Sequence, residues 1–188
     1  SCIPFIYGCM VVNSLNYDSL ANTNQVSETD LTNLCISIVY GCMDVNSFNF
    51  NPLANTDSTC IYAQEMAIGV WDINPDCEEI DILGQVILLN DQLPDSVNVQ
   101  VNEEEKLFIY IGETQVSATI DNLGSIAVPE QTASIDAGFG FPIPVQIDGS
   151  GKIESDISGY MNLTFSGEFE IIQGLPPTSF SSTCYITL

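Results

Sequence analysis

Two kinds of side chain in this 188-residue chain carry chemistry: cysteine thiols and the oxygen atoms of Asp, Asn and Glu. The sequence contains 25 acidic residues against two lysines, with no arginine and no histidine, and its formal net charge is −23. Without histidine there is no Ser-His-Asp or Cys-His nucleophile pair and no imidazole ligand for a metal. What remains is hard-cation binding by oxygen, catalysis by carboxylates alone, and the chemistry of seven cysteines, at positions 2, 9, 35, 42, 60, 77 and 184.

One stretch concentrates the oxygen atoms that calcium prefers. Between Cys42 and Cys60, Asp and Asn alternate with other residues, at Asp44, Asn46, Asn49, Asn51, Asn55 and Asp57. Calcium binds six to eight oxygens from carboxylates, amides and backbone carbonyls. We therefore predict a calcium site here, with the ligands Asp44, Asn46, Asn49, Asn51 and Asp57. The alternative is that these residues only form turns, because Asn and Asp side chains accept hydrogen bonds from the following backbone.

The net charge excludes several classes of partner. A phosphate backbone is bound by lysine and arginine with release of counterions, and the only such residues here are Lys106 and Lys152. We predict no binding of nucleic acid, and the same repulsion disfavours anionic membranes and nucleotides. Hydrolysis of glycosides by a pair of carboxylates stays open, but no cluster of aromatic residues marks a sugar cleft around any pair. We predict that the protein is not an enzyme.

The cysteines indicate the compartment. They include no short CxxC-type pair of the kind that structural zinc sites use, so disulfides are the better interpretation. Disulfides persist in oxidising surroundings, which predicts an extracellular, cell-surface or virion-surface location. No run of about 18 apolar residues is present, so we expect no transmembrane segment. No signal peptide is visible, and we expect the chain to be a mature or truncated form.

The first third of the chain is a tandem repeat. Residues 7–24 align with residues 40–57 at an offset of 33, and twelve of the eighteen aligned positions are identical. Cys2 and Cys35 are related by the same offset, and the first unit carries eight extra residues before Cys35. A fixed period of this size is typical of an array of small modules. We place the two repeats within residues 1–62.

The second unit carries a recognisable pattern at Gly41, Cys42, Asp44, Asn49, Pro52, Ala54, Asp57 and Cys60. It resembles the short cysteine-bounded repeats, of the form GC-x-D-x-x-A-x-N-Y-x-P-x-A-x-x-D-D-G-S-C, found in tandem on secreted and surface proteins of marine and gliding bacteria and on some marine viruses. The first unit departs from this pattern, with Val11 and Asn24 at two acidic positions. The resemblance implies that each unit closes on its own cysteines, as Cys9–Cys35 and Cys42–Cys60.

Closure by a disulfide is physically reasonable for units of this size. About 25 residues bury too little surface to fold alone, and a disulfide across such a loop contributes roughly 3 kcal/mol. In the register of the repeats, Cys2 corresponds to the closing cysteine of a preceding unit. Three interpretations of Cys2 remain open: membership of a longer array, a disulfide to another molecule, and lipid modification after cleavage of a signal peptide.

Residues 63–188 have the pattern of a β-domain. Strand-like runs alternate with turn sequences and no helical period persists; the first predicted strand is Met66–Ile73, and a predicted turn follows at residues 74–76. The predicted fold class is all-β, with small disulfide-stapled repeats followed by an antiparallel β-barrel or β-sandwich. Cys77 and Cys184 would tie the ends of this domain together.

Five elements of this domain recur in a familiar order: Gly69-Val70-Trp71, Cys77, Ile126–Gln131, Gly149-Ser150-Gly151 and Cys184-Tyr185-Ile186. The opening Gly-x-Trp looks like that of lipocalin-like barrels, and the order resembles a small bacteroidete-type β-barrel domain of secreted proteins. A lipocalin-like barrel implies an internal ligand cavity, whereas large side chains meeting inside would fill a barrel of this size. The side chains that would do so are Phe108, Tyr110, Phe139, Phe141, Phe165 and Phe169.

Three functions are compatible with these features. The first is an extracellular structural or adhesive surface protein, with the repeats as a stalk, as in a subunit of a filament or fibre; a virion fibre or decoration protein fits equally. Its partners would be further copies or other surface proteins and glycans, because exposed strand edges offer pairing surfaces. The second is a small-ligand-binding module tethered by the repeats. The third, an acid–base hydrolase, requires two carboxylates that face one another in a cleft.

Overall fold

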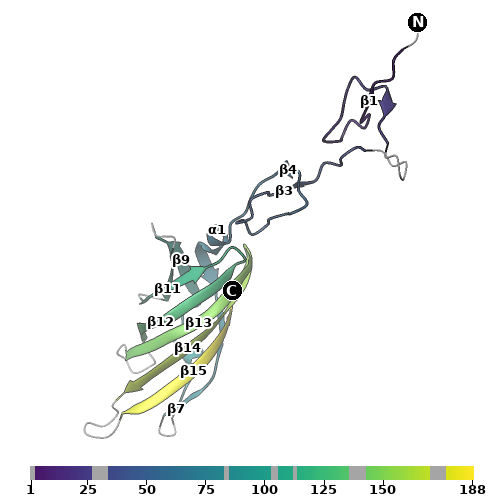
Figure 1. Cartoon of the computed structure of the whole chain (residues 1–188). Helices are drawn as coiled ribbons and strands as arrows, with labels where there is room; N and C mark the ends of the chain where they lie inside the picture. The colour runs from purple at the N-terminus through teal and green to yellow at the C-terminus, as the bar shows by residue number, and fades with distance from the viewer. Residues whose placement is uncertain are drawn as a thin grey trace. The chain divides into compact units, whose positions relative to one another are not determined.

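A computed structural model describes residues 3–26, 34–82, 85–102, 106–111, 114–135, 143–169 and 177–188, so Cys2 lies outside the described residues. The chain divides into two compact units, Ser1–Cys60 and Ile61–Leu188. The elements, many of which are labelled in Figure 1, are β1 (Tyr7–Gly8), β2 (Thr23–Asn24), β3 (Tyr40–Gly41), β4 (Thr56–Asp57), α1 (Ala63–Ala67), β5 (Gly69–Asp72), β6 (Asn74–Cys77), β7 (Ile80–Ile82), β8 (Gln85–Ile87), η1 (Leu89–Asp91), β9 (Ser96–Val101), β10 (Leu107–Ile111), β11 (Thr114–Ile120), β12 (Ser125–Ile135), β13 (Ile143–Ser155), β14 (Ser158–Phe169) and β15 (Thr178–Thr187).

Each repeat in the first unit is a loop held by a two-residue parallel ladder, an isolated parallel bridge and one disulfide. β1 pairs with β2 in the first repeat, and β3 pairs with β4 in the second. Among the described residues of this unit, only Cys9, Ser14, Cys42 and Ser47 are buried. Covalent closure and hydrogen bonds, not a hydrophobic core, therefore hold the repeats together, as expected for modules this small.

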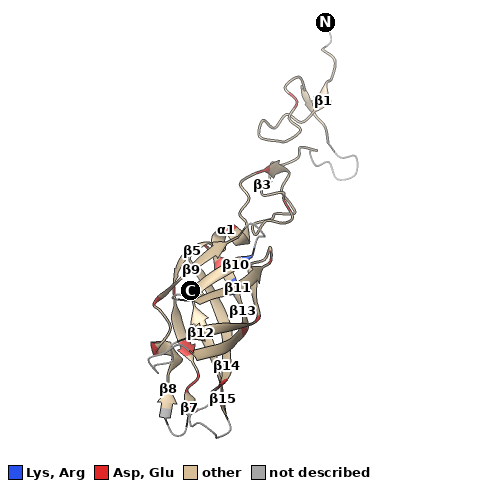
Figure 2. Cartoon of the chain, turned by 90° about the vertical axis from the view of Figure 1, so that its left-hand side faces the viewer, with Lys and Arg blue, Asp and Glu red and all other residues tan. Residues whose placement is uncertain are grey.

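The second unit is a nine-strand antiparallel sheet that curls into a near-closed barrel (Figures 1 and 2), in the order β5-β9-β10-β11-β12-β13-β14-β15-β6. Of the two architectures that the sequence predicted, the barrel is the one observed. β5 and β6 stand at opposite ends of this order, yet only Ile73 separates them in the chain. One stretch therefore pairs with β9 through its first half and with β15 through its second half, which brings the two ends of the sheet together.

The barrel interior is built by strict alternation along the strands. In β13 the side chains of Ile143, Val145 and Ile147 are buried while those between them are exposed. A period of two places alternate side chains on opposite faces of a sheet. The exposed positions carry most of the acidic residues, which Figure 2 shows scattered over the unit. The largest fully buried side chains of this core include Phe165, Leu89, Leu107, Ile147 and Ile153.

Both of the local elements that were predicted above by residue range were wrong. The predicted strand at Met66–Ile73 begins instead with the one-turn helix α1, whose Ala67 carbonyl accepts a hydrogen bond from the indole Nε1 of Trp71 at 2.9 Å. The predicted turn at residues 74–76 is part of β6, where Pro75 lies opposite Ile186. Proline is tolerated there because β6 ends the sheet order and has one paired neighbour, so the missing N–H interrupts no second ladder.

The side chain of Gln131 bonds the backbone of β11 where the pairing of β11 with β12 is interrupted. The register of β12 on β13 shifts between Val128 and Gln131, and β12 pairs with β11 only near its beginning. Beyond that point the Gln131 amide takes the place of a backbone group: its Oε1 accepts from Ser117 N and its Nε2 donates to Ser117 O, both at 2.8 Å. A β-bulge is thereby accommodated without leaving the β11 backbone unpaired.

The β11–β12 turn is held by Asp121. Its Oδ1 accepts the backbone N–H of Ser125 at 2.8 Å and that of Leu123 at 2.9 Å. The bond from Ser125, followed by that from Leu123, holds the pKa of Asp121 below its ordinary value, since both favour the ionised carboxylate. Gly124 completes the turn with a positive φ of 82°, a conformation that favours glycine.

Candidate functional site

The predicted calcium ligands lie in the second repeat, where several of them bond to the backbone of their own loop. Oδ1 of Asp44 accepts the N–H of Asn46 at 2.9 Å, and Oδ1 of Asn51 accepts the N–H of Leu53 at 3.0 Å. The first repeat has the second of these bonds too, with Asp18 in the position of Asn51. Asx turns of this kind account for part of the Asp and Asn content.

The other two predicted ligands are placed differently. The Nδ2 of Asn49 donates to the carbonyl of Thr59 at 3.0 Å, and Asp57 lies in β4. No group of three or more His, Cys, Asp or Glu side chains positioned to hold a metal ion occurs in the described part of the chain. A calcium site would thus need amide and backbone oxygens beside Asp44 and Asp57, which is chemistry that calcium accepts. Calcium binding stays a prediction.

Chelation of calcium is expected to loosen residues 42–60 and to leave the first repeat unchanged, because Val11 and Asn24 replace acidic residues there. A metal that binds only the folded loop stabilises it by RT ln(1 + [L]/Kd). The measurement is hydrogen exchange with and without calcium, on the wild type and on Asp44→Asn/Asp57→Asn. If hydrogen-exchange protection responds neither to calcium nor to the double substitution, the Asp and Asn residues form turns and bind no calcium.

The most regular feature of the repeats is a set of asparagine side chains that hold the backbone. The sequence did not predict this role, although Asn49 and Asn55 were named above as oxygen donors for calcium. Asn55 holds the segment that enters the second repeat: its Oδ1 accepts from Val39 N and its Nδ2 donates to Ser37 O, both at 2.9 Å. Asn22 makes the same two bonds, with Ile6 N and Pro4 O, at 3.0 Å each. The sequence signal for this role was that asparagine recurs at both positions, at the offset of 33. A side-chain amide that accepts one hydrogen bond and donates another requires both this residue type and a fixed geometry.

A second asparagine holds the segment that leaves each repeat. In the first repeat, Nδ2 of Asn16 donates to Leu34 O at 2.9 Å and its Oδ1 accepts from Ile36 N at 2.8 Å. Asn49 occupies the equivalent position and bonds Thr59 O. The segment between the repeats is thus held by Asn16 from one repeat and by Asn55 from the next. These asparagines act as structural clamps for the polypeptide.

All three expected disulfides are present. Cys9–Cys35 and Cys42–Cys60 close the two repeats, with sequence separations of 26 and 18 residues. Cys77–Cys184 has a separation of 107 residues and joins directly opposed residues of β6 and β15. They indicate an oxidising, extracellular environment. Among the described residues, no helix is long and apolar enough to cross a membrane.

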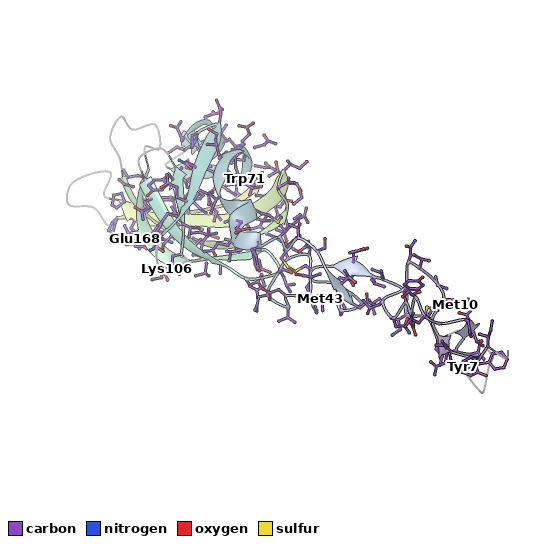
Figure 3. The ribbon with its side chains drawn as sticks, turned by 90° about the horizontal axis from the view of Figure 1, so that it is seen from above. Tyr7, Met10, Met43, Trp71, Lys106 and Glu168 are labelled. Atoms are coloured by element: carbon purple, nitrogen blue, oxygen red, sulfur yellow. A yellow bond between two sulfur atoms is a disulfide. The ribbon has the colours of Figure 1, made fainter. Side chains whose placement is uncertain are left out.

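Around Trp71, the described residues of the barrel interior leave little free space. The cavity around Trp71 measures about 30 Å³ and is lined by apolar side chains, whereas pockets for small ligands measure about 300–1,000 Å³. Trp71 is buried in the wall of this cavity, and Figure 3 shows it among the strands of the second unit. Its place on the first barrel strand is that of a core residue, not of a platform for a ligand.

The aromatic side chains expected inside the barrel only partly account for its filling. Phe165 is fully buried, but Phe108 and Tyr110 alternate with the buried Leu107 and Ile109 and are only partly covered. Phe139, Phe141 and the side chain of Phe169 lie outside the described residues. Most of the described interior is aliphatic, from β9, β10, β11 and β13.

Comparison with protein-family models, with curated proteins and with solved structures finds no match. The chemistry of the chain and its own geometry are therefore the basis for assigning a function.

Proposed function

We propose that this chain is an extracellular structural or adhesive surface protein, in which disulfide-closed repeats tether a solid β-barrel. The observation that carries the proposal is the packed interior around Trp71, where the described residues leave a cavity of about 30 Å³ that holds water at most. An antiparallel barrel stapled by Cys77–Cys184 and packed in this way serves as a rigid body that presents its outer surface. The resemblance of residues 2–62 to tandem repeats of surface proteins supports the same conclusion.

The high negative charge is consistent with this role. Charge far from neutrality keeps a protein soluble and repels most nonspecific contacts, and salt screens the self-repulsion within about 10 Å at 0.1 M. A virion fibre or decoration protein is the second candidate, since the same rigid and disulfide-closed architecture suits a particle surface. A lipocalin-like carrier is disfavoured, because the observed cavity is about a tenth of the smallest usual ligand pocket.

Labelling with an antibody raised against residues 61–188 tests the proposal. We expect gold particles on the outer surface of intact source cells, or on virus particles if the second candidate is right. Native mass spectrometry of the same material is expected to show no bound small molecule. Recovery of the protein only in soluble form, with an apolar ligand attached, would replace the proposal by the carrier function; recovery from the cytoplasm with reduced cysteines would also contradict it.

A further inference from the structure

Large apolar side chains recur on the surface of both repeats. Tyr, Met, Val and Leu each occupy the same aligned position in the two repeats, at the offset of 33. The exposed fractions in the first and second repeat are 62% and 67% for Tyr7 and Tyr40, 43% and 50% for Met10 and Met43, 70% and 67% for Val12 and Val45, and 74% and 77% for Leu20 and Leu53. Figure 3 labels Tyr7, Met10 and Met43 on the two repeats. Together these side chains form the apolar set of the repeats.

A neighbouring repeat does not cover the apolar set. The first repeat is followed by the second, and the second is preceded by the first, yet the exposed fractions are similar in both. The exposure therefore does not depend on which side of a unit another repeat stands. Single apolar residues scattered over a surface are normal, whereas a set of large ones presented together is typical of an interaction site.

The fold of the repeat explains other identical positions, but not the apolar set. In the first repeat, Cys9 forms a disulfide, Ser14 is buried, Asn22 clamps the backbone and the Thr23 hydroxyl donates to the Asn22 amide oxygen. The aligned residues of the second repeat do the same. The apolar set faces solvent, where polar side chains would serve the fold equally well. The reason for apolar residues at these positions therefore lies outside the repeat.

The distribution of charge restricts where another copy can approach. Residues 1–60 contain five of the 25 acidic residues, and the others lie in residues 61–188. Two barrels in contact would bring many like charges together, which costs free energy. Two sets of repeats in contact bring few carboxylates together. A contact between copies is therefore least opposed by electrostatic repulsion at the repeats.

The period of the apolar set restricts the partner further. A partner that covers the set in both repeats must present a matching apolar surface with the same spacing. A second copy of this chain has that spacing, because its own repeats are built in the same way. A cationic partner would instead be attracted to the barrel, where most of the carboxylates lie. These observations favour a second copy as the occupant.

We propose that two copies of this protein associate through the apolar sets of their repeats. Both copies use the same surface, so the contact is isologous. The inference rests on the proposed structural function and specifies how copies join. It leaves the outer surface of each barrel free to be presented.

Sedimentation analysis of two double variants tests the contact. The wild type is expected to dimerise with rising concentration, and Leu20→Gln/Leu53→Gln should raise the dissociation constant at least about ten-fold, because it removes an apolar side chain from each repeat. The matched control is Leu123→Gln/Ile157→Gln, which replaces two apolar residues of the barrel that are 68% and 82% exposed and should leave the dissociation constant unchanged. All four side chains are exposed, so circular dichroism should not change. A Cys2→Ser background excludes disulfide-linked dimers.

Photo-crosslinking identifies the contact directly. Benzoylphenylalanine in place of Tyr40, in unlabelled protein mixed with ¹⁵N-labelled protein, should form adducts with labelled peptides from residues 7–24 or 40–57. The same group in place of Leu123 should not. Adducts only with residues 61–188 of the labelled copy, or equal weakening by both double variants, would overturn the proposed contact.

A wild type that stays monomeric at all concentrations would also overturn it. If that monomer binds a surface polysaccharide of the source and the Leu20→Gln/Leu53→Gln variant does not, the apolar set serves a glycan and not a second copy. None of these outcomes decides the proposed surface function, which antibody labelling tests separately.

Discussion

Replacing Cys77 and Cys184 together by alanine is expected to lower the free energy of unfolding of the barrel by about 4–5 kcal/mol. The disulfide spans 107 residues, and the chain-entropy model assigns about 4.7 kcal/mol to a loop of about 100 residues. It also lies at the seam of the barrel, where β6 and β15 pair. Without it, backbone pairing and the packing of Trp71 in the core hold residues 69–77 where the ends of the sheet meet.

Urea unfolding followed by Trp71 fluorescence measures this effect. Alanine is preferred to serine because Cys184 is fully buried and a serine hydroxyl there would need a hydrogen-bond partner. The control is Cys42→Ala/Cys60→Ala, which opens the second repeat and should leave the barrel transition where it was. A loss below about 1 kcal/mol in the Cys77/Cys184 variant would mean that strand pairing alone closes the barrel.

Substitution of Gly149 by alanine is expected to destabilise the barrel by about 3 kcal/mol, the upper end of the range for overpacking. Gly149 lies on β13, and a β-carbon there would overlap the carbonyl oxygen of Asn162 and crowd Leu163 on β14. A flexible side chain can move aside, but a carbonyl in the sheet ladder cannot. Glycine at this position lets β13 and β14 approach each other closely.

Thermal unfolding compares Gly149→Ala with Ser150→Ala, which is the matched control on the same strand. Ser150 is exposed and lies on the outer face, so its substitution should change stability by no more than about 0.5 kcal/mol. Gly151→Ala should behave like Gly149→Ala, because its β-carbon would meet Met161 and the Tyr160 carbonyl. Equal stability of the Gly149 and Ser150 variants would show that β13 and β14 separate easily at this point.

Local patterns in the sequence predicted some of this structure well. The offset of 33 and the resemblance of the second unit to cysteine-bounded repeats implied the two repeat disulfides, and the two cysteines of the β-domain predicted Cys77–Cys184. Local propensity failed at residues 66 and 74–76. There the contacts with neighbouring elements determine the secondary structure. The carbonyl of Ala67, at the end of α1, accepts a hydrogen bond from the Trp71 indole, and pairing with β15 places Pro75 in a strand. Tertiary pairing overrides weak local preference.

The clamps formed by Asn16, Asn22 and Asn55 illustrate a second limit. Their identity between repeats was visible, but Asn serves turns, metal sites and capping alike. Only the bonds to Pro4, Ile6, Ser37 and Val39 distinguish a clamp from a ligand.

By itself, the sequence determined the all-β class, the acidic composition and the absence of histidine chemistry, since these follow from composition and short-range periodicity. The disulfide closure of the repeats was implied by their resemblance to cysteine-bounded repeats. The sequence left the barrel and the sandwich undecided, because both require the same alternation of inward and outward residues. Only the tertiary structure decided that residues 69–77 pair with both β9 and β15, and that the described interior around Trp71 leaves a cavity of only about 30 Å³. Each of these depends on pairing between residues far apart in the chain, which no local pattern encodes.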